Sequence, residues 1–339
     1  VILDAEAEQL DHKETAEKII EYNPTLVCFS IYGQQPSAST QCMPGAIKTC
    51  NFLNDLSDFK FKTIAIGTHP SALPKRTLRD GPFNFVGKGE CLSTMEYLIE
   101  FIKGNGEIKK VPGLHYFDDN GEVCKNLSSP LVKDLDNVIP RQRLELLNMK
   151  NYRAHNWHCF DNLDSRGSYA SLQTSLGCPF KCTFCCINAP FESNQIRFWS
   201  PENVISQIDE LVLKHNIRNI KIPDEMFVLN PKQVMSICEK IIERNYNLNF
   251  WAYARIDTLQ NEKMLEKMKE AGMHWIAIGI ESASEHVRDG VVKGRFRFED
   301  IIKTIHRVKK FDFNIGANYI FGLPDDDHKS MRNTLDLAK

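Results

Sequence analysis

Four cysteines lie within nine residues of this 339-residue chain, in the stretch CPFKCTFCC that begins at Cys178. Cys178, Cys182 and Cys185 form a C-x-x-x-C-x-x-C pattern, and Cys186 follows directly. Thiolates at this spacing are suited to a soft metal centre, which means zinc or an iron–sulfur cluster. The chemistry of the segment depends on which of the two it holds.

Zinc is the less favoured of these two centres. A closed zinc site uses four ligands, commonly as two separated C-x-x-C pairs, and the chain has no second pair. Cys186 is nominally a fourth ligand, but adjacent residues rarely reach the same tetrahedral centre. A 4Fe–4S cluster held by three cysteines instead leaves one iron without a protein ligand. The pattern therefore favours an iron–sulfur cluster whose open iron binds a substrate.

The elements that position these cysteines alternate between β-rich runs and amphipathic helices. In the second half of the chain, strands are predicted at 170–176, 219–223, 249–256, 275–281 and 314–321. Ser200-Pro201 and Asn230-Pro231 are expected to begin two of the intervening helices. Serial β/α units predict an α/β fold, a partial parallel (β/α)6 barrel similar to a TIM barrel, over residues 169–339. Active sites of such barrels lie at the carboxyl ends of the strands, and the cysteines follow the first strand.

Residues 1–128 show a second alternation of this kind. Strands are predicted at 25–30, 62–67 and 83–87, and helices at 13–22, 39–54 and 91–103. This order predicts a doubly wound, Rossmann-like sheet with any ligand at the carboxyl ends of the strands. A hairpin is expected to follow, because Asn120-Gly121 favours a tight primed turn. Residues 129–168 are weakly periodic and are interpreted as the linker between two domains.

Both ends of the chain are expected to be incomplete. The first stretch, VILDAE, resembles the second strand of a nucleotide-binding-like sheet whose first strand is absent. The last stretch, SMRNTLDLAK, stops within a predicted helix, so the C-terminal part of the barrel is expected to be missing.

The composition limits the class of partner. The formal net charge is -2, and charged residues of both signs, 25% of the chain, are mixed along it. We therefore expect no attraction to nucleic acid or to a membrane surface. No run is long and apolar enough for a membrane span, and the first residues lack the features of a signal peptide. A cytoplasmic protein is expected, with single cysteines such as Cys28 and Cys238 as reduced thiols.

The cysteine segment resembles the signature of the radical S-adenosylmethionine (SAM) superfamily, which places an aromatic residue, here Phe184, directly before the last cysteine. The resemblance implies that Cys178, Cys182 and Cys185 hold a 4Fe–4S cluster whose open iron binds the amino and carboxylate groups of SAM. It also implies reductive cleavage of SAM to methionine and a 5′-deoxyadenosyl radical, with the electron coming from a flavodoxin- or ferredoxin-type donor. The protein orients these cofactors and excludes competing reactions.

Two further segments resemble the parts of this family that hold the methionine end of SAM. Asp224 and Glu225 in IPDEMF follow the second predicted strand, where the family places an acidic residue against the amino group. Glu225 is the preferred residue, and a solvated acidic turn is the alternative. Arg255 in ARID is suited to a bidentate pairing with the methionine carboxylate. An ordinary surface arginine is the alternative there.

Two more segments resemble the parts that hold the nucleoside. Glu281 and Ser282 in GIES correspond to a pair that hydrogen-bonds the ribose hydroxyls. Gly322 in FGLPDD corresponds to a segment whose backbone lies beside adenine, because glycine permits close approach of the backbone. Each of the four segments follows one of four successive predicted strands. No single structural explanation accounts for all four resemblances.

Residues 1–128 followed by the barrel resemble the cobalamin-binding subgroup of the superfamily. The matching stretches are VILDAEAE, NPTLVCFSIYG, IAIGTHPSALP and FVGKGE, so the resemblance spans nearly the whole chain. It implies a corrinoid whose tail enters the small sheet; a flavodoxin-like structural domain is the alternative. The implied cradle consists of strand-end glycines and polar residues: Ser30, Tyr32, Gly33, Gly67, Thr68, His69, Gly87, Gly89 and Glu90.

The chain departs from some cobalamin proteins in its cobalt ligand. The D-x-H-x-x-G motif, which supplies a histidine to cobalt, is absent, and His69 is followed by Pro70. Cobalamin is therefore expected to bind with its own base displaced and without a protein imidazole. Tyr32 and Gln34 are candidates to approach its lower face.

The segment YRAHNWHCF, residues 152–160, concentrates polar and sulfur-containing side chains before the barrel. An interdomain packing loop is the favoured interpretation, because a connector between two domains has an interface to fill. The alternative is that His158 contributes to a substrate or corrinoid pocket. A metal site made by His155, His158 and Cys159 is a further alternative, which no partner residues elsewhere support.

These observations predict a cobalamin-dependent radical SAM enzyme that methylates an unactivated carbon of a small molecule. One SAM would remethylate cobalt, and a second would supply the radical that removes a hydrogen from the substrate. A radical cyclase or another carbon-skeleton rearrangement is the alternative within the class. A corrinoid-binding or electron-transfer module without radical catalysis is the alternative from another class.

Overall fold

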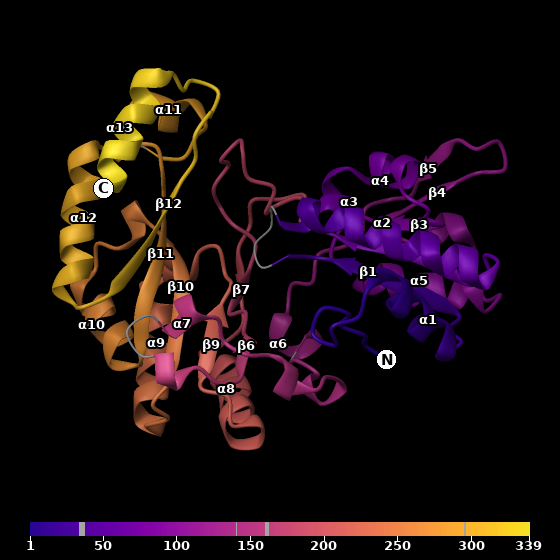
Figure 1. The fold of residues 1–339 in the computed structure, drawn as a ribbon, viewed down its shortest axis with the longest axis horizontal. Helices are drawn as coiled ribbons and strands as arrows, with labels where there is room; N and C mark the ends of the chain where they lie inside the picture. The colour runs from indigo at the N-terminus through magenta and orange to yellow at the C-terminus, as the bar shows by residue number, and fades with distance from the viewer. Residues whose placement is uncertain (34–37, 140, 160–162, 295) are drawn as a thin grey trace. The chain divides into compact units, whose positions relative to one another are not determined.

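The computed structural model describes residues 1–33, 38–139, 141–159, 163–294 and 296–339, which divide into two compact α/β units (Figure 1). The N-terminal unit comprises Leu3–Lys133 and Cys185–Gln195. The C-terminal unit comprises Val1–Ile2, Asp134–Phe184 and Ile196–Lys339. The domain limits predicted at residues 128 and 168 stay predictions.

The N-terminal unit contains one mixed sheet of order β1-β2-β3-β4-β5. Its strands are β1 (Leu26–Ile31), β2 (Lys62–Gly67), β3 (Phe85–Gly87), β4 (Leu114–Phe117) and β5 (Val123–Lys125). Its helices are α1 (His12–Glu21), α2 (Ala38–Ser57), α3 (Thr68–Ala72), α4 (Pro74–Asp80), α5 (Leu92–Ile102) and the short 3-10 helix η1 (Ile108–Lys110). Strands β1, β2 and β3 are parallel, and β4 and β5 pair antiparallel. The predicted alternation of strands and helices is confirmed.

Two local predictions for this unit are wrong. The β4–β5 turn is not a primed turn at Asn120-Gly121, because only Gly121 has a positive φ (+78°). The Asp118 carboxylate instead accepts hydrogen bonds from the N–H groups of Asn120 and Glu122, so the turn begins earlier. The initial stretch VILDAE is not a strand: a turn at 5–9 closes on the N–H of Glu8, which donates to the Asp4 carbonyl.

The C-terminal unit contains a five-stranded, all-parallel sheet of order β12-β11-β10-β9-β6. Its strands are β6 (Tyr169–Ser171), β9 (Asn219–Ile222), β10 (Asn249–Arg255), β11 (Met273–Glu281) and β12 (Asn314–Tyr319). The helices are α6 (Leu135–Val138), α7 (Asn156–Cys159), α8 (Pro201–His215), α9 (Pro231–Arg244), α10 (Glu262–Glu270), α11 (Glu285–Gly290), α12 (Phe298–Lys310) and α13 (His328–Ala338). Short 3-10 helices are η2 (Leu144–Leu146), η3 (Met149–Asn151), η4 (Leu163–Ser165), η5 (Phe227–Leu229) and η6 (Ile256–Thr258).

The helix starts follow from the predicted caps. The Ser200 hydroxyl accepts from the N–H of Asn203 at 3.1 Å, and the Asn230 side chain accepts from the N–H groups of Lys232 and Gln233. Pro201 and Pro231 occupy the first helical positions, where no N–H is needed. Both predicted helix starts are confirmed.

The strand predicted at 170–176 is divided. Residues 169–171 join the sheet as β6, whereas β7 (Ser175–Leu176) pairs antiparallel with β8 (Arg197–Phe198) in a separate ribbon. Local periodicity cannot show this break, because it arises from hydrogen bonds between residues 174–175 and a side chain that follows β9. None of the helices in the described residues is long and apolar enough to cross a membrane.

Candidate functional site

Asp224 holds the segment that leads into the first cysteine. It follows β9, is buried, and accepts hydrogen bonds from the Thr174 N–H (2.9 Å), the Thr174 hydroxyl (2.7 Å) and the Ser175 hydroxyl (2.6 Å). Burial raises the pKa of Asp224 to about 6, and the bonds from Ser175 and Thr174 oppose that rise. A solvated acidic turn is therefore wrong for Asp224, which positions residues 174–175 ahead of Cys178.

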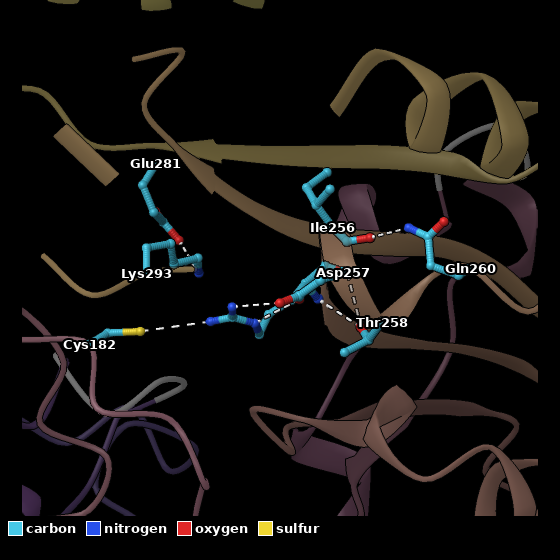
Figure 2. Close-up of polar contacts among 8 residues, drawn as sticks. Cys182, Ile256, Asp257, Thr258, Gln260, Glu281 and Lys293 are labelled. Atoms are coloured by element: carbon cyan, nitrogen blue, oxygen red, sulfur yellow. Dashed lines mark hydrogen bonds and ion pairs between the residues drawn. The ribbon is translucent and has the colours of Figure 1, made fainter. Parts of the chain in front are cut away.

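Arg255 ends β10 with its side chain buried, so an ordinary surface arginine is wrong. Its guanidinium forms two hydrogen bonds with the Asp257 carboxylate, Nε to Oδ1 at 2.9 Å and Nη2 to Oδ2 at 2.8 Å. The guanidinium carbon lies 3.7 Å from the ring centroid of Phe180. Nη1 lies 3.8 Å from Cys182 Sγ, and Figure 2 marks this contact by the dashed line from Cys182. The structure thus brings the predicted carboxylate-binding arginine to one predicted cluster ligand.

Glu281 ends β11 in a strained and enclosed position. Its backbone φ is +66°, a value that residues other than glycine rarely adopt. Its carboxylate forms a buried ion pair with Lys293, in which Nζ lies 2.6 Å from Oε1 (Figure 2). A Cβ at Gly279 would meet Glu281 Oε1 at 2.5 Å and Lys293 Nζ at 2.8 Å. Strain of this kind persists only where the surroundings hold it, and it concentrates at functional sites.

Glu225 shares the electrostatic environment of this ion pair. Burial raises the pKa of Glu225 to about 7; the charge of Lys293 opposes the rise, and the charge of Asp224 adds to it. Lys221 on β9 also opposes it, and burial lowers the pKa of Lys221 to about 8. Buried groups of both signs therefore surround Glu225, as expected where a charged ligand group is recognised.

The three predicted cluster ligands differ in exposure. Cys178 is buried, Cys182 is partly buried and Cys185 is exposed. None of the eleven cysteines, all of which the structure describes, is in a disulfide, so the donor set has the thiol chemistry that an iron–sulfur cluster requires. Burial raises the pKa of the Cys178 thiol, whereas the Phe180 N–H and the Arg255 charge lower it. Metal binding would remove that proton.

Convergence of these three sulfurs stays a prediction. Among the described residues, no three His, Cys, Asp or Glu side chains form a group that could hold a metal ion. Cys178 and Cys182 belong to the C-terminal unit, and Cys185 belongs to the N-terminal unit. The aromatic residue of the motif, Phe184, is 39% exposed.

The predicted nucleoside contacts lie in different settings. Ser282 is buried, and its hydroxyl lies 3.3 Å from the Thr334 hydroxyl of α13 and accepts from the Ser284 N–H. Gly322 is exposed with φ +81°, and its N–H donates to Asp326. A Cβ at Gly322 would meet nothing within 4 Å. Glycine is therefore favoured there by the positive φ and not by close neighbours. The assigned ligand contacts of Ser282 and Gly322 stay predictions.

The cradle residues of the N-terminal unit lie at one edge of its sheet. Strands β1, β2 and β3 run parallel, so the residues that follow them share the carboxyl edge. Gly67, with φ +132°, permits close approach, since a Cβ would lie 2.1 Å from the Ile31 carbonyl oxygen. Ser30, Tyr32 and Gly33 are exposed, whereas Thr68, Gly87 and Gly89 are buried and Glu90 is half-buried. Their contacts with cobalamin stay predictions.

His69 is occupied by contacts within this edge. Its Nδ1 lies 3.0 Å from the Thr40 hydroxyl, and its N–H donates to the Ser39 hydroxyl. Burial lowers the pKa of His69. The Glu90 carboxylate accepts from the Val132 N–H at 2.7 Å. Gln34, the other candidate for the lower corrinoid face, lies outside the described residues.

The segment at 152–160 contacts the opposite edge of the second sheet. Cys159 Sγ lies 3.8 Å from both Asn219 and Asn249, the first residues of β9 and β10. This amino edge is opposite the carboxyl ends that carry Arg255 and Glu281, which supports packing as the role of Cys159. The side chain of His158 lies outside the described residues, so its predicted contribution to a pocket stays a prediction.

Three site residues were missed by sequence reasoning. Phe180 stands inside the cysteine segment, and an aromatic residue there was a usable signal. Asp257 follows Arg255 by two residues and is a plain acidic neighbour. Lys293 is twelve residues beyond its partner Glu281 and has no local signal, since only the loop after α11 brings it back.

Comparison with known families decides the class of the second unit. A family model described as the Radical SAM superfamily matches residues 172–338, which include Cys178, Arg255 and Glu281. The chain contains a radical SAM domain. The radical SAM domain therefore includes both the cysteine motif and the carboxyl edge of the five-stranded sheet.

Relatives extend the likeness beyond the radical SAM domain. An uncharacterized methyltransferase of Pyrococcus horikoshii is 29% identical over all of this chain and 69% of its own length. An anaerobic magnesium-protoporphyrin IX monomethyl ester cyclase of Rubrivivax gelatinosus is 23% identical over all of this chain and 58% of its own length. The chain thus spans only part of the length of each of these relatives.

Solved structures share the fold of both units. The cobalamin-dependent SAM radical enzyme OxsB with aqua-cobalamin bound matches 96% of this chain and 45% of its own, with a TM-score of 0.73 and 21% identity. The radical SAM methyltransferase TsrM of Kitasatospora setae, with cobalamin and a [4Fe–4S] cluster bound, matches 99% of this chain and 63% of its own, with a TM-score of 0.75 and 16% identity. At these identities the likeness concerns the fold.

Proposed function

We propose that the chain is the cofactor-binding part of a radical SAM enzyme that methylates an unactivated carbon of a small molecule with the help of cobalamin. Cys178, Cys182 and Cys185 would hold a 4Fe–4S cluster. The observation that carries the proposal is the buried Arg255, whose guanidinium Nη1 lies 3.8 Å from Cys182 Sγ. The family match of residues 172–338 supports it.

Arg255 is suited to orient the methionine end of SAM. Asp257 fixes Nε and Nη2, and Phe180 supports one face of the guanidinium, so the remaining donor has a defined direction. That donor, Nη1, is directed at Cys182 (Figure 2), where a carboxylate bound beside the cluster would also lie. Pre-organisation of this kind lowers the entropy cost of holding the ligand.

Glu225 and Glu281 are suited to the other groups of SAM. A cationic amino group beside Glu225 would favour the ionised carboxylate and lower its pKa from about 7. Glu281, held by Lys293, presents a fixed acceptor at the end of β11 for ribose hydroxyls. When bound, the cluster and SAM supply reductive cleavage of a carbon–sulfur bond; these residues orient SAM and exclude water from it.

The finer architecture is part of the proposal. The five parallel strands of the second unit would form a partial (β/α)6 barrel, and the first unit would form a cobalamin-binding-type domain. Its cradle would consist of Ser30, Tyr32, Gly33, Gly67, Thr68, His69, Gly87, Gly89 and Glu90. The likeness to OxsB and TsrM supports this assignment. A flavodoxin- or ferredoxin-type donor would supply electrons, and the protein would act in the cytoplasm.

Substitution of one cysteine tests the cluster. In anaerobically purified protein, Cys182→Ala should abolish the brown colour, bound iron and sulfide, and formation of 5′-deoxyadenosine from SAM. Cys186→Ala is the matched control, since the adjacent thiol is not an assigned ligand, and it should retain all of these. One zinc without inorganic sulfide in the wild-type protein would overturn the proposal.

Radical cyclisation is a second candidate function. The Rubrivivax relative, which is named a cyclase, matches the whole chain. Reaction with methyl-labelled SAM separates the two candidates, because only methylation transfers label to the product. A protein that released no 5′-deoxyadenosine under strong reductant would instead be a corrinoid-binding or electron-transfer module.

A further inference from the structure

A cavity of about 630 Å³ lies in the N-terminal unit, and none of its lining residues is one of the predicted cobalamin-cradle residues. It is bordered by β4, β5 and the segment that follows the cysteine motif, and all of its lining residues belong to this one unit. Cavities that hold small molecules commonly have volumes of roughly 300–1,000 Å³. The residues with chemistry in its wall are Lys88, Lys109, His115, Lys125, Ser128 and Glu192.

The wall of this cavity carries excess positive charge. Lys88 forms an ion pair with Glu192, whose pKa it lowers, so these two charges largely compensate each other. Within the described residues, neither Lys109 nor Lys125 takes part in an ion pair. The ammonium groups of Lys109 and Lys125 thus line a cavity whose one carboxylate, Glu192, is already paired with Lys88. A negatively charged ligand would neutralise their charge.

His115 supplies a second, independent sign of a missing ligand. It lies on β4 directly opposite Lys125 on β5, lines the cavity and is only 5% exposed. Its Nδ1 has no hydrogen-bond partner among the residues that the structure describes. Buried polar atoms are almost always paired in native proteins, so such an atom in a cavity wall indicates a site for a ligand. Burial lowers the pKa of His115, whereas its hydrogen bond with the Gly113 backbone raises it.

The backbone around the cavity is held firmly. Asn126 donates from Nδ2 to the carbonyl oxygens of Ile108 and Val111 at 2.6 and 2.8 Å. Gly113 has φ +71°, and a Cβ there would lie 2.4 Å from the Lys88 carbonyl oxygen. Glu192 itself is held at φ +49°. A wall built with strained and tightly packed positions is pre-organised, which is typical of a binding site.

We propose that this cavity binds the oxyanion group, a phosphate or a carboxylate, of a small molecule, with Lys109 and Lys125 as its donors and His115 Nδ1 in its wall. None of its lining residues is assigned to the cluster, to SAM or to cobalamin, and the site does not depend on the proposed reaction. Charge-assisted hydrogen bonds from lysines fit either oxyanion.

Binding of two probes to the full chain tests the site. Isothermal titration with pyrophosphate and with citrate at low ionic strength should detect a single site for one of them, and the stronger probe identifies phosphate or carboxylate as the preferred group. Lys109→Gln combined with Lys125→Gln should weaken binding about tenfold or more. Lys110→Gln, next to Lys109 but outside the cavity wall, should leave binding unchanged.

Two further measurements keep the test decisive. Ring ¹⁵N resonances of His115 should shift on addition of the probe, and a circular dichroism melt should show that the double variant folds. Saturating hydroxocobalamin should leave the affinity for the probe unchanged. The proposal is overturned if neither probe binds at millimolar concentration, if the double variant binds as well as wild type, or if cobalamin competes.

Discussion

At the scale of single residues, burial separates the site from ordinary surface chemistry. Arg255, Asp224 and Glu281 are each no more than 6% exposed. Charged side chains are almost never fully buried unless they are paired, and each of these has a fixed partner: Asp257, Thr174 with Ser175, and Lys293. Their directions are therefore set before any ligand arrives.

Arg255→Lys should weaken SAM binding by about tenfold or more, because an ammonium group cannot keep two bonds to Asp257 while presenting a third donor beside Cys182. Equilibrium dialysis with labelled SAM measures the change on reconstituted protein. Arg244→Lys is the matched control, since Arg244, the last residue of α9, pairs with Asp209 of α8, away from the carboxyl ends of the strands. Equal SAM affinity in Arg255→Lys and wild type would contradict the assigned role.

Asp224 should give stability a specific pH dependence. Its pKa is about 6 in the folded state and 3.8 ordinarily, so the folded protein holds this proton more tightly than the unfolded chain. The stabilisation that comes from this tighter proton binding is fully present below pH 3.8 and is lost as the pH rises through 6. In total it amounts to on the order of 3 kcal/mol of the free energy of unfolding. The free energy of unfolding of wild type minus that of Asp224→Asn should therefore fall as pH rises from 4.5 to 7 in urea titrations.

Asp327→Asn provides the control of opposite sign. Backbone hydrogen bonding from Ser330 lowers the pKa of Asp327, so its contribution is present at neutral pH and lost as pH falls. The free energy of unfolding of wild type minus that of Asp327→Asn should therefore not fall as the pH rises. A flat or rising difference for Asp224→Asn would show that its carboxyl group is not held in a desolvated state.

At the scale of elements, parallel strands gather the site. β9, β10 and β11 run in register through pairs such as Ala252–Ile222 and Arg255–Gly279, so residues at their carboxyl ends meet at one edge. The N-terminal sheet uses the same device in β1, β2 and β3, where the register joins Ile31 to Gly67. Close strand packing at this second edge depends on the absence of a side chain at Gly67.

Gly67→Ala should destabilise the protein by more than about 3 kcal/mol, because the new Cβ would lie 2.1 Å from the Ile31 carbonyl oxygen at a positive φ. Gly104→Ala is matched in having a positive φ of +86° but has nothing within 4 Å of the new Cβ. It should cost about 1 kcal/mol from backbone strain alone. Urea denaturation measures both changes, and equal losses would show that contact with Ile31 does not matter.

At the scale of the whole molecule, the proposed function requires two metal cofactors, one for each unit. Relatives and solved structures match both units together. Anaerobically reconstituted protein should therefore contain about four iron atoms and one cobalt atom per chain. Metal analysis after gel filtration checks the ratio, and iron without cobalt after incubation with hydroxocobalamin would contradict the proposed role of the first unit.

His69→Ala should leave the absorption spectrum of bound cobalamin unchanged. The chain lacks the motif that supplies histidine to cobalt, and His69 is followed directly by Pro70. A spectral change in the variant would show that His69 does reach the metal.

The amino-acid sequence by itself determined the cysteine motif, the alternation of strands and helices, and the helix starts at Ser200 and Asn230. These features depend on local spacing and local hydrogen bonds, which the sequence expresses directly. It also placed Arg255 and Glu281 at strand ends, because strand ends follow from the same periodicity.

Only the tertiary structure decided which of these side chains are buried and what holds them. The break after β6, the ion pair of Glu281 with Lys293 and the stacking of Arg255 on Phe180 join residues that are 12 to 75 positions apart. The cavity around His115 likewise joins β4 to a segment that lies far along the chain. Such contacts depend on how elements pack, and packing energy is not encoded in the pattern of any single element.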